Sequence, residues 1–215
     1  MLGCVLEHDT EAGPVAVELT EVEAYAGAVD PASHAFRGRT NRNEVMFGPP
    51  GRAYVYFTYG MHFCVNVTCQ PAGVPEAVLL RAGRVIIGEP LARRRRVLWR
   101  PGKNKTSEMN EECDATPASA MPARDLARGP ARLCQALAID RELNGVDLCV
   151  ASSPLRLRAS AADTQAAGER PIAVGPRVGV RAGAGTPWRY WIANDPTVSV
   201  YRPSKPRVRQ HQEPR

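Results

Sequence analysis

The chain has 215 residues, 44% of them hydrophobic, which suits one globular domain or at most two small ones. It contains no apolar run of about 18 residues, so the sequence excludes a transmembrane helix. The N-terminal segment lacks the basic start and the apolar stretch of a signal peptide, which predicts an intracellular protein.

Positive charge is unevenly distributed along the chain, whose net charge is +6. Residues 1–36 contain seven acidic residues and no Lys or Arg, whereas residues 81–105 contain nine basic residues and one acid. Four consecutive arginines occupy positions 93–96. This asymmetry indicates an anionic partner such as nucleic acid, although an Arg-rich helix face that is merely solvated would give the same pattern.

Motifs for metals and nucleotide cofactors are missing. None of the six Cys residues forms a C-x-x-C pair, and no His stands at ligand spacing from a Cys pair. G-x-G-x-x-G and Walker A motifs are also absent. The sequence therefore predicts no metal and no cofactor.

Short alternating runs dominate the chain and predict strands. In chain order these runs cover residues 15–25, 53–59, 62–69, 77–87, 146–150, 155–158, 176–180, 189–193 and 197–201. Helices are predicted at 88–99 and 129–139, each with a Pro near its first turn. Residues 100–122 are predicted to form a surface loop. The pattern indicates an α+β fold with a mostly antiparallel sheet and a few covering helices.

Two stretches could carry chemistry. In "TEVEAY", Glu23 and Tyr25 are two positions apart on a strand, so their side chains share one face. In "YVYFTYGM", a tight turn at Gly60 joins two strands and places Tyr59 near the hairpin tip. Taken singly, a strand Glu is usually solvated and aromatic rows usually pack across strands, but Tyr59 could also wedge between stacked bases.

Longer blocks resemble the 3-methyladenine (alkyladenine) DNA glycosylase family in order and spacing, from about residue 13 to 202. These blocks are "TEVEAYAGAVDPASHAF", "RNEVMFGPPGRAYVYFTYGMHFCVNV", "AVLLRA" and "GPARLCQALAID". The resemblance implies one DNA glycosylase domain at 1–202, built on a curved sheet or partial barrel with a protruding hairpin. A basic, disordered tail would follow at 203–215.

The resemblance also implies roles for individual residues. Glu23 would be the catalytic Glu, whose carboxylate activates a water, and Arg81 would help place the attacking water. The base pocket would be formed by Tyr25, His34, Tyr56 and Asn66. Intercalation would use Tyr59 and Met61, and the DNA backbone would be contacted by Arg39, Arg42 and Arg132. Arg132 replaces a Lys that is common in relatives, and His62 replaces a familiar Tyr.

The implied function is base excision repair of double-stranded DNA. The protein would be a monomer that flips a damaged purine and hydrolyses its glycosidic bond with a Glu-activated water. Expected lesions are 3-methyladenine, with 7-methylguanine, hypoxanthine and ethenoadenine as further candidates. None of the three lysines lies in the matching blocks, so no lyase activity is expected.

Alternatives remain open at this point. The fold also resembles a formyltransferase C-terminal domain, so a non-catalytic DNA- or RNA-binding module is conceivable, although the Glu-x-Tyr pair and Tyr59 argue against it. A metal hydrolase is disfavoured because the ligand spacings are missing.

Overall fold

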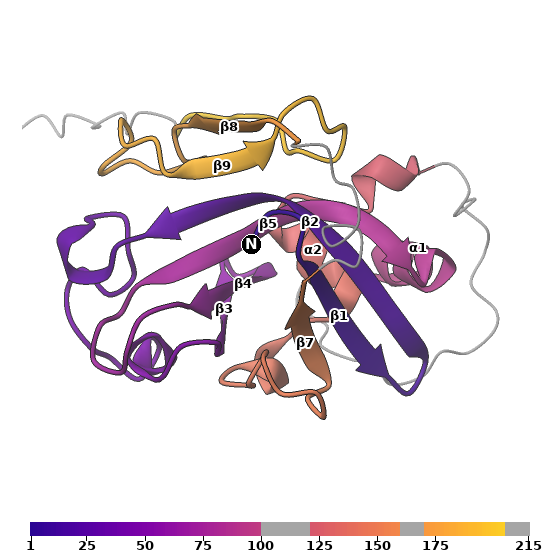
Figure 1. The fold of residues 1–215 in the computed structure, drawn as a ribbon, viewed down its shortest axis with the longest axis horizontal. Coiled ribbons are helices and arrows are strands. Elements are labelled where there is room, and N and C mark those ends of the chain that lie inside the picture. The colour runs from indigo at the N-terminus through magenta and orange to yellow at the C-terminus, as the bar shows by residue number, and fades with distance from the viewer. Residues whose placement is uncertain (100–120, 160–169, 205–215) are drawn as a thin grey trace, which may run out of the picture.

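A computed structural model describes residues 1–99, 121–159 and 170–204 (Figure 1). These residues form one antiparallel sheet that curls into a half-barrel, together with two α-helices. The strands are β1 (Val5–Thr10), β2 (Gly13–Tyr25), β3 (Ala53–Thr58), β4 (His62–Thr68), β5 (Ala77–Ile87), β6 (Ala127–Arg128), β7 (Leu155–Arg158), β8 (Ile172–Gly175) and β9 (Arg189–Ile192). The helices are α1 (Glu89–Leu98) and α2 (Pro130–Leu137).

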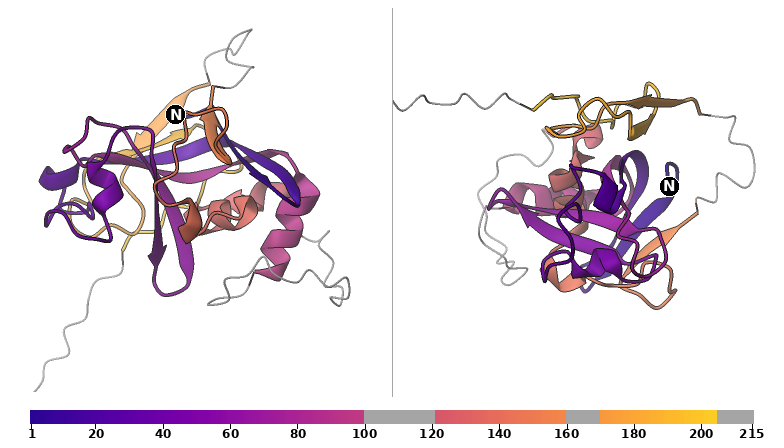
Figure 2. Two further views of the ribbon diagram at one scale, coloured as in Figure 1. Left: turned by 90° about the horizontal axis from the view of Figure 1, so that it is seen from below. Right: turned by 90° about the vertical axis from the view of Figure 1, so that its left-hand side faces the viewer.

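The order of strands in the sheet is β3-β4-β5-β2-β1-β7, so the long strands β2 and β5 lie at its centre. Where β1 leaves β2, β9 takes its place along the same strand and carries β8 with it. The hairpin of β3 and β4 protrudes from the body of the molecule (Figure 2). This architecture confirms the predicted α+β class, the six predicted strands that match β2, β3, β4, β5, β7 and β9, and both helices.

Three strand predictions were wrong. Residues 146–150 contribute only an isolated bridge between Asp147 and Arg52, and residues 176–180 and 197–201 are not strands. The last two segments alternate like strands, but their backbone amides at Val178 and Ser199 donate to buried carboxylates on β2 rather than to a ladder. The short β6, which pairs with β5, gave no recognisable pattern.

Strand β1 was missed because its sequence "VLEHDT" mixes charged and apolar residues. The structure gives the acids a partner strand: Arg156 and Arg158 on β7 form ion pairs with Glu7 of β1. The predicted loop at 100–122 lies almost entirely outside the described residues, and so does the predicted tail from 205 onward.

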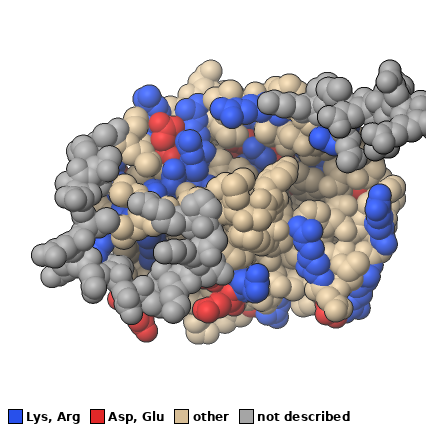
Figure 3. Space-filling view, turned by 180° about the vertical axis from the view of Figure 1, so that it is seen from behind, with Lys and Arg blue, Asp and Glu red and all other residues tan. Residues whose placement is uncertain are grey.

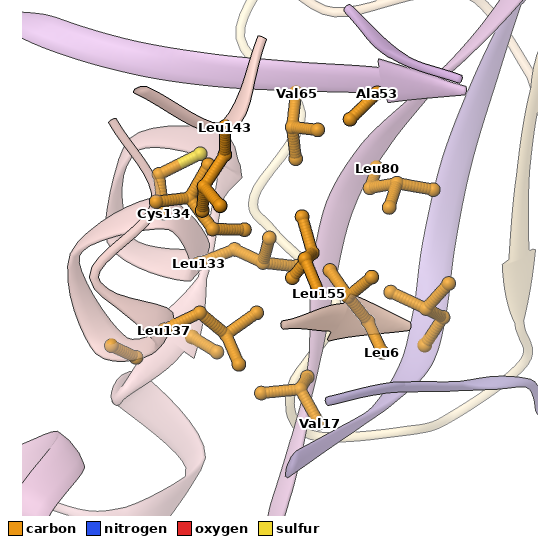
Figure 4. Packing of buried hydrophobic residues seen from close by; sticks show 14 of the residues in the cluster. Leu6, Val17, Ala53, Val65, Leu80, Leu133, Cys134, Leu137, Leu143 and Leu155 are labelled. Atoms are coloured by element: carbon orange, nitrogen blue, oxygen red, sulfur yellow. The ribbon is translucent and has the colours of Figure 1, made fainter. Parts of the chain in front are cut away.

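The hydrophobic core lies between α2 and the central strands (Figure 4). Leu133 and Leu137, four apart on α2, meet Val17 of β2 and Leu80 of β5 within one cluster. Each of these side chains is almost fully buried, and burying a Leu stabilises the fold by roughly 1.5–3 kcal/mol. The core therefore fixes one face of β2 and β5 and leaves their other face for polar groups.

The arginine run at 93–96 serves mainly to dock α1. Arg93 bonds Glu89 one turn back, Arg95 donates to Thr10 and to the Ala136 carbonyl, and Arg96 donates to the Leu126 carbonyl. These three arginines therefore form neither a merely solvated helix face nor a patch that is free to bind nucleic acid. On the face seen in Figure 3, basic side chains cover more of the surface than acidic ones do. No helix in the described ranges is long and apolar enough to cross a membrane.

Candidate active site

A single row of residues crosses four neighbouring pairs of strands and defines the candidate site. Tyr54 on β3 pairs with Asn66 on β4, which pairs with Leu79 on β5. Leu79 in turn pairs with Glu23 on β2, which pairs with Arg189 on β9. Neighbouring strands lie about 4.8 Å apart, so this register gathers residues up to 166 positions apart in sequence (23 to 189) into one strip.

Irregular pairing in β2 turns the acids of this strand away from the core. Val15, Val17 and Leu19 point into the core, and strict alternation would send residue 21 there too. Register shifts on both sides of Glu21 change the phase, so Val22 enters the core instead. Glu21, Glu23 and Tyr25 consequently share the opposite face.

Glu23 is completely buried, with 0% of its surface exposed. Its Oε2 accepts a hydrogen bond from the Tyr25 hydroxyl at 2.9 Å, which confirms that the two side chains share a face. Its Oε1 accepts one from the backbone N–H of Val178 at 2.7 Å and lies 3.2 Å from Nη1 of Arg81. Glu23 is therefore not a solvated strand acid.

Glu21 is a second buried carboxylate in this site, and sequence reasoning gave it no role. Its Oε1 accepts from Nε of Arg81 and Nε of Arg189, each at 2.7 Å. Its Oε2 accepts from the backbone N–H of Ser199 at 2.7 Å. Arg81 thus bridges the two carboxylates, and Glu21 holds the guanidinium that touches Glu23.

The ionised states of this cluster support one another. Burial alone would raise the pKa of the Glu21 carboxyl, but Arg81 and Arg189 outweigh burial and lower the pKa overall. Burial alone would lower the pKa of Arg81, but Glu23 and Glu21 raise it. Glu21 and Arg81 are therefore charged at neutral pH.

A second buried ion pair ties down the segment that covers Glu23. Arg177, next to Val178, makes a bidentate pair with Asp30, and Nη2 of Arg177 lies 2.9 Å from Oδ1 of Asp30. Its guanidinium lies 4.6 Å from the ring centre of Tyr25. We call Glu21, Glu23, Asp30, Arg81, Arg177 and Arg189 the buried ionic network. Sequence spacing gave no signal for Asp30 or Arg177, because 147 positions separate them.

A pocket adjoins the network and contains all four predicted base-binding residues. It is lined by Tyr25, Ala32, Ser33, His34, Met46, Tyr56 and Asn66. A cleft of about 540 Å³ continues from it past Arg81 to Tyr59. His34 meets Tyr56 edge-on at 4.6 Å, and Asn66 presents a buried Oδ1 with no hydrogen-bond partner among the described residues.

Tyr54 supports the pocket from behind. It stacks on Tyr56 with ring centres 5.2 Å apart, and its hydroxyl lies 2.9 Å from Nδ1 of His34. Partial burial, and then the charge of Arg42, lowers the pKa of His34, so the ring is neutral.

The hairpin tip is the most exposed part of the site. Tyr59 is 83% exposed and Met61 is 44% exposed. Gly60 has a φ of 65°, as predicted, and Tyr59 itself has a φ of 52°, in a region that a bulky residue rarely adopts. The type I′-like geometry matches the twist of the strands and holds the Tyr59 ring out in solvent.

The three arginines predicted to contact the DNA backbone have different surroundings. Arg39 is exposed and pairs with Glu44 at 2.6 Å, whereas Arg42 reaches toward the pocket wall. Arg132, on α2, is half-exposed and lies 3.9 Å from Asp125. Across residues 1–99, 121–159 and 170–204, no group of three His, Cys, Asp or Glu side chains is placed to hold a metal ion.

Comparison with known proteins gives a consistent picture. Residues 1–196 match the family model described as methylpurine-DNA glycosylase (MPG). A protein of Streptomyces avermitilis is 48% identical over 98% of this chain and 88% of its own length. Proteins of Leifsonia xyli and Mycobacterium tuberculosis are 45% and 44% identical over 94% and 86% of this chain, and 85% and 80% of their own lengths. All three carry the name "Putative 3-methyladenine DNA glycosylase".

Proposed function

Because this chain belongs to the methylpurine-DNA glycosylase family, we propose that it excises alkylated or deaminated purines from double-stranded DNA as a monofunctional glycosylase. One observation carries the proposal: a fully buried Glu23, held by Arg81 and Tyr25, lies beside a pocket with aromatic walls. That the protein works as a monomer in the cytoplasm or nucleoid stays a prediction.

Access to a base within a duplex requires that the nucleotide leave the stack, at a cost of a few kcal/mol. The cleft runs from Tyr59 to the aromatic pocket, which gives a flipped nucleotide a continuous path. Tyr59 would fill the gap left in the duplex, and stacking on the neighbouring bases would return roughly 1–3 kcal/mol. Met61, also exposed at the tip, would extend this apolar wedge.

The flipped purine would lie between Tyr56 on one side and Tyr25 and His34 on the other. Electron-rich rings attract a cationic base by roughly 0.5–2 kcal/mol, and alkylation at N3 or N7 makes a purine cationic. Asn66 would contact the purine edge, because its Oδ1 is buried without a partner and faces a pocket it lines. We expect this contact to discriminate against the exocyclic amine of normal guanine.

Hydrolysis would proceed through attack of water on C1′ of the sugar. Glu23 takes a proton from the water as the oxygen bonds C1′, and the electrons of the glycosidic bond leave with the base. A carboxylate offers about four lone-pair positions, and Val178, Arg81 and Tyr25 use three, which leaves one for water. Tyr25 and Arg81 line the cleft, so water there lies one side chain from Glu23.

Positive charge that develops on the sugar would be stabilised by the carboxylate of Glu23 in a site closed to bulk water. Arg81 would orient the water and hold Glu23 in place. Glu21, which grips the other side of Arg81, would act as a positioning residue for both.

A lyase reaction would need an amine nucleophile that forms a Schiff base with C1′. All three lysines, Lys103, Lys105 and Lys205, lie outside the blocks that form the pocket, and also outside the described residues. We therefore propose that the product is an intact abasic site. Borohydride added during turnover should trap no covalent protein–DNA adduct, and a trapped adduct would contradict this part of the proposal.

The function itself is tested by incubating the protein with duplexes that each carry one lesion: 3-methyladenine, 7-methylguanine, hypoxanthine or ethenoadenine. Chromatography of the supernatant should detect the free base from at least one of them. Tight binding without release of any base would instead identify a non-catalytic DNA-binding module.

A further inference from the structure

Two arginines lie against the aromatic walls of the base pocket. The guanidinium of Arg177 lies 4.6 Å from the ring centre of Tyr25, and that of Arg42 lies 5.9 Å from the ring centre of Tyr56. A cation already placed on an aromatic ring reduces the attraction of that ring for a second cation. The pocket is therefore less favourable to a cationic base than bare Tyr and His rings would be.

The two arginines differ in how their charge is compensated. Arg177 is buried in a bidentate pair with Asp30, so the pair is neutral as a whole. Arg42 is exposed and donates to the Phe57 carbonyl at 3.3 Å, which is a neutral acceptor. No carboxylate within the described ranges lies at ion-pair distance from Arg42. Its charge is therefore screened by solvent but is not neutralised by an ion-pair partner.

The charge of Arg42 reaches the pocket interior. After partial burial, Arg42 is the second cause that lowers the pKa of His34, one of the pocket walls. Arg42 also lowers the pKa of Tyr54, although burial raises that pKa more, to about 12. Both effects have the sign of a positive potential that disfavours any further positive charge between His34 and Tyr56.

We propose that Arg42 is a specificity-determining residue that biases the base pocket toward neutral lesions and against cationic ones. This inference rests on the proposed glycosylase function and divides its substrates by charge. Neutral deaminated or etheno purines form one class, and N3- or N7-alkylated purines form the other. The family resemblance implies that Arg42 contacts the DNA backbone, and its own contacts also place it against Tyr56 of the pocket wall.

The preference for neutral lesions applies to the transition state as well as to binding. A cationic purine enters with one positive charge and leaves neutral, whereas a neutral purine enters uncharged and develops negative charge as it leaves. The two bases therefore differ by one unit of charge at each stage, including the transition state. A fixed positive potential favours the neutral class in kcat/KM and not only in binding.

The test measures kcat/KM for two lesions, 7-methylguanine and hypoxanthine, in otherwise identical duplexes. It compares proteins with and without the positive charge at Arg42. Arg42→Gln should raise the ratio of kcat/KM for 7-methylguanine to that for hypoxanthine about fivefold, which equals about 1 kcal/mol. Work at about pH 7 keeps His34 neutral, because its pKa lies below the ordinary value, and avoids the loss of the N1 proton that would neutralise 7-methylguanine at higher pH. An unchanged or lowered ratio would overturn the proposal.

Two control variants separate this effect from general loss of DNA affinity. Arg42→Lys keeps the charge and should keep the wild-type ratio within about twofold. Arg39→Gln removes a charge from the same loop, but Arg39 is paired with Glu44 and lies over Phe47, outside the pocket. Arg39→Gln should lower kcat/KM for both lesions by the same factor and leave their ratio unchanged. If Arg39→Gln changed the ratio as much as Arg42→Gln does, the proposal would also be overturned.

Failure of the proposed function gives a different result from failure of this inference. If wild-type protein releases the base from none of the four lesions named above, the proposed function is wrong. If it releases both 7-methylguanine and hypoxanthine and the ratio does not respond to Arg42→Gln, the proposed function stands and the role of Arg42 is wrong. Circular dichroism of each variant confirms that the fold is intact.

Discussion

The buried ionic network and the hairpin tip occupy the two ends of one cleft and are built in opposite ways. Glu21 and Glu23 are fully buried and each is held by several hydrogen-bond and ion-pair partners, whereas Tyr59 is 83% exposed and held only by its turn. Buried charges need every partner to offset the loss of hydration, but an exposed ring is free to contact another molecule. The proposed catalytic residues therefore also stabilise the fold, whereas the proposed DNA-binding ring does not.

The largest expected effect is on stability at the Asp30–Arg177 pair. Asp30→Asn removes the carboxylate and leaves a buried guanidinium unpaired, which should lower the free energy of unfolding by about 3–5 kcal/mol. Glu44→Gln breaks the exposed pair with Arg39 and should cost less than about 1 kcal/mol. Urea denaturation measures both, and equal losses would erase the distinction between the two regions.

Next in size is the effect of Glu21 on catalysis. Glu21→Gln frees Arg81 from its anchor, so single-turnover base release should fall by roughly 10–100-fold, as for other groups that orient a catalytic partner. The affinity for lesion DNA should stay within about twofold, because Glu21 does not line the cleft. Glu18 lies on the same strand as Glu21 and pairs with Arg170, so Glu18→Gln, which breaks that pair, is the matched control. A Glu21→Gln enzyme as fast as the control would contradict the positioning role.

Tyr59 should show the reverse pattern. Tyr59→Ala removes a stacking ring and should weaken binding to lesion DNA by roughly 10–100-fold. The free energy of unfolding should change by less than about 0.5 kcal/mol, since the side chain is exposed. A large loss of stability with unchanged DNA affinity would mean that the ring packs in the folded protein.

The smallest effect concerns pH. Arg81 and Arg189 keep the pKa of Glu21 below its ordinary value despite burial, so folding gains stability from the ionised carboxylate. This gain is complete above the pKa of the unfolded chain, about 4.3, and is lost as the pH falls through the folded value. Wild-type protein should therefore lose stability below about pH 4, and Glu21→Gln should lose less over that range. A steeper loss in the variant would reverse the assigned sign.

Local pattern was enough to predict much of the fold and part of the site. Period-two alternation identified β2 and the β3–β4 hairpin, and the spacing of Glu23 and Tyr25 predicted their shared face. Gly60 predicted the turn of this hairpin. The irregular pairing that turns the Glu21 side chain away from the core could not be predicted from the sequence. It depends on the partner strand β5 rather than on residues 19–22. Asp30 and Arg177 meet only after the chain has folded.

The arginine run shows the limit of charge patterns. Four adjacent arginines indicated an anionic partner, yet three of them hold α1 against carbonyls and side chains of the same chain. Arg42 lies outside that run, yet tertiary structure brings its guanidinium to 5.9 Å from the ring centre of Tyr56. Density of charge in a sequence therefore says less about function than the presence or absence of a buried counter-charge.

The central claim is that Glu23, within the buried ionic network, is the carboxylate that activates water. It is tested most directly by single-turnover release of a damaged base with wild-type protein and with Glu23→Gln, alongside binding to the same duplex. We expect the wild type to release the damaged base and Glu23→Gln to release it at least about 100-fold more slowly. Both proteins should bind the duplex. Release by Glu23→Gln at the wild-type rate would contradict the central claim.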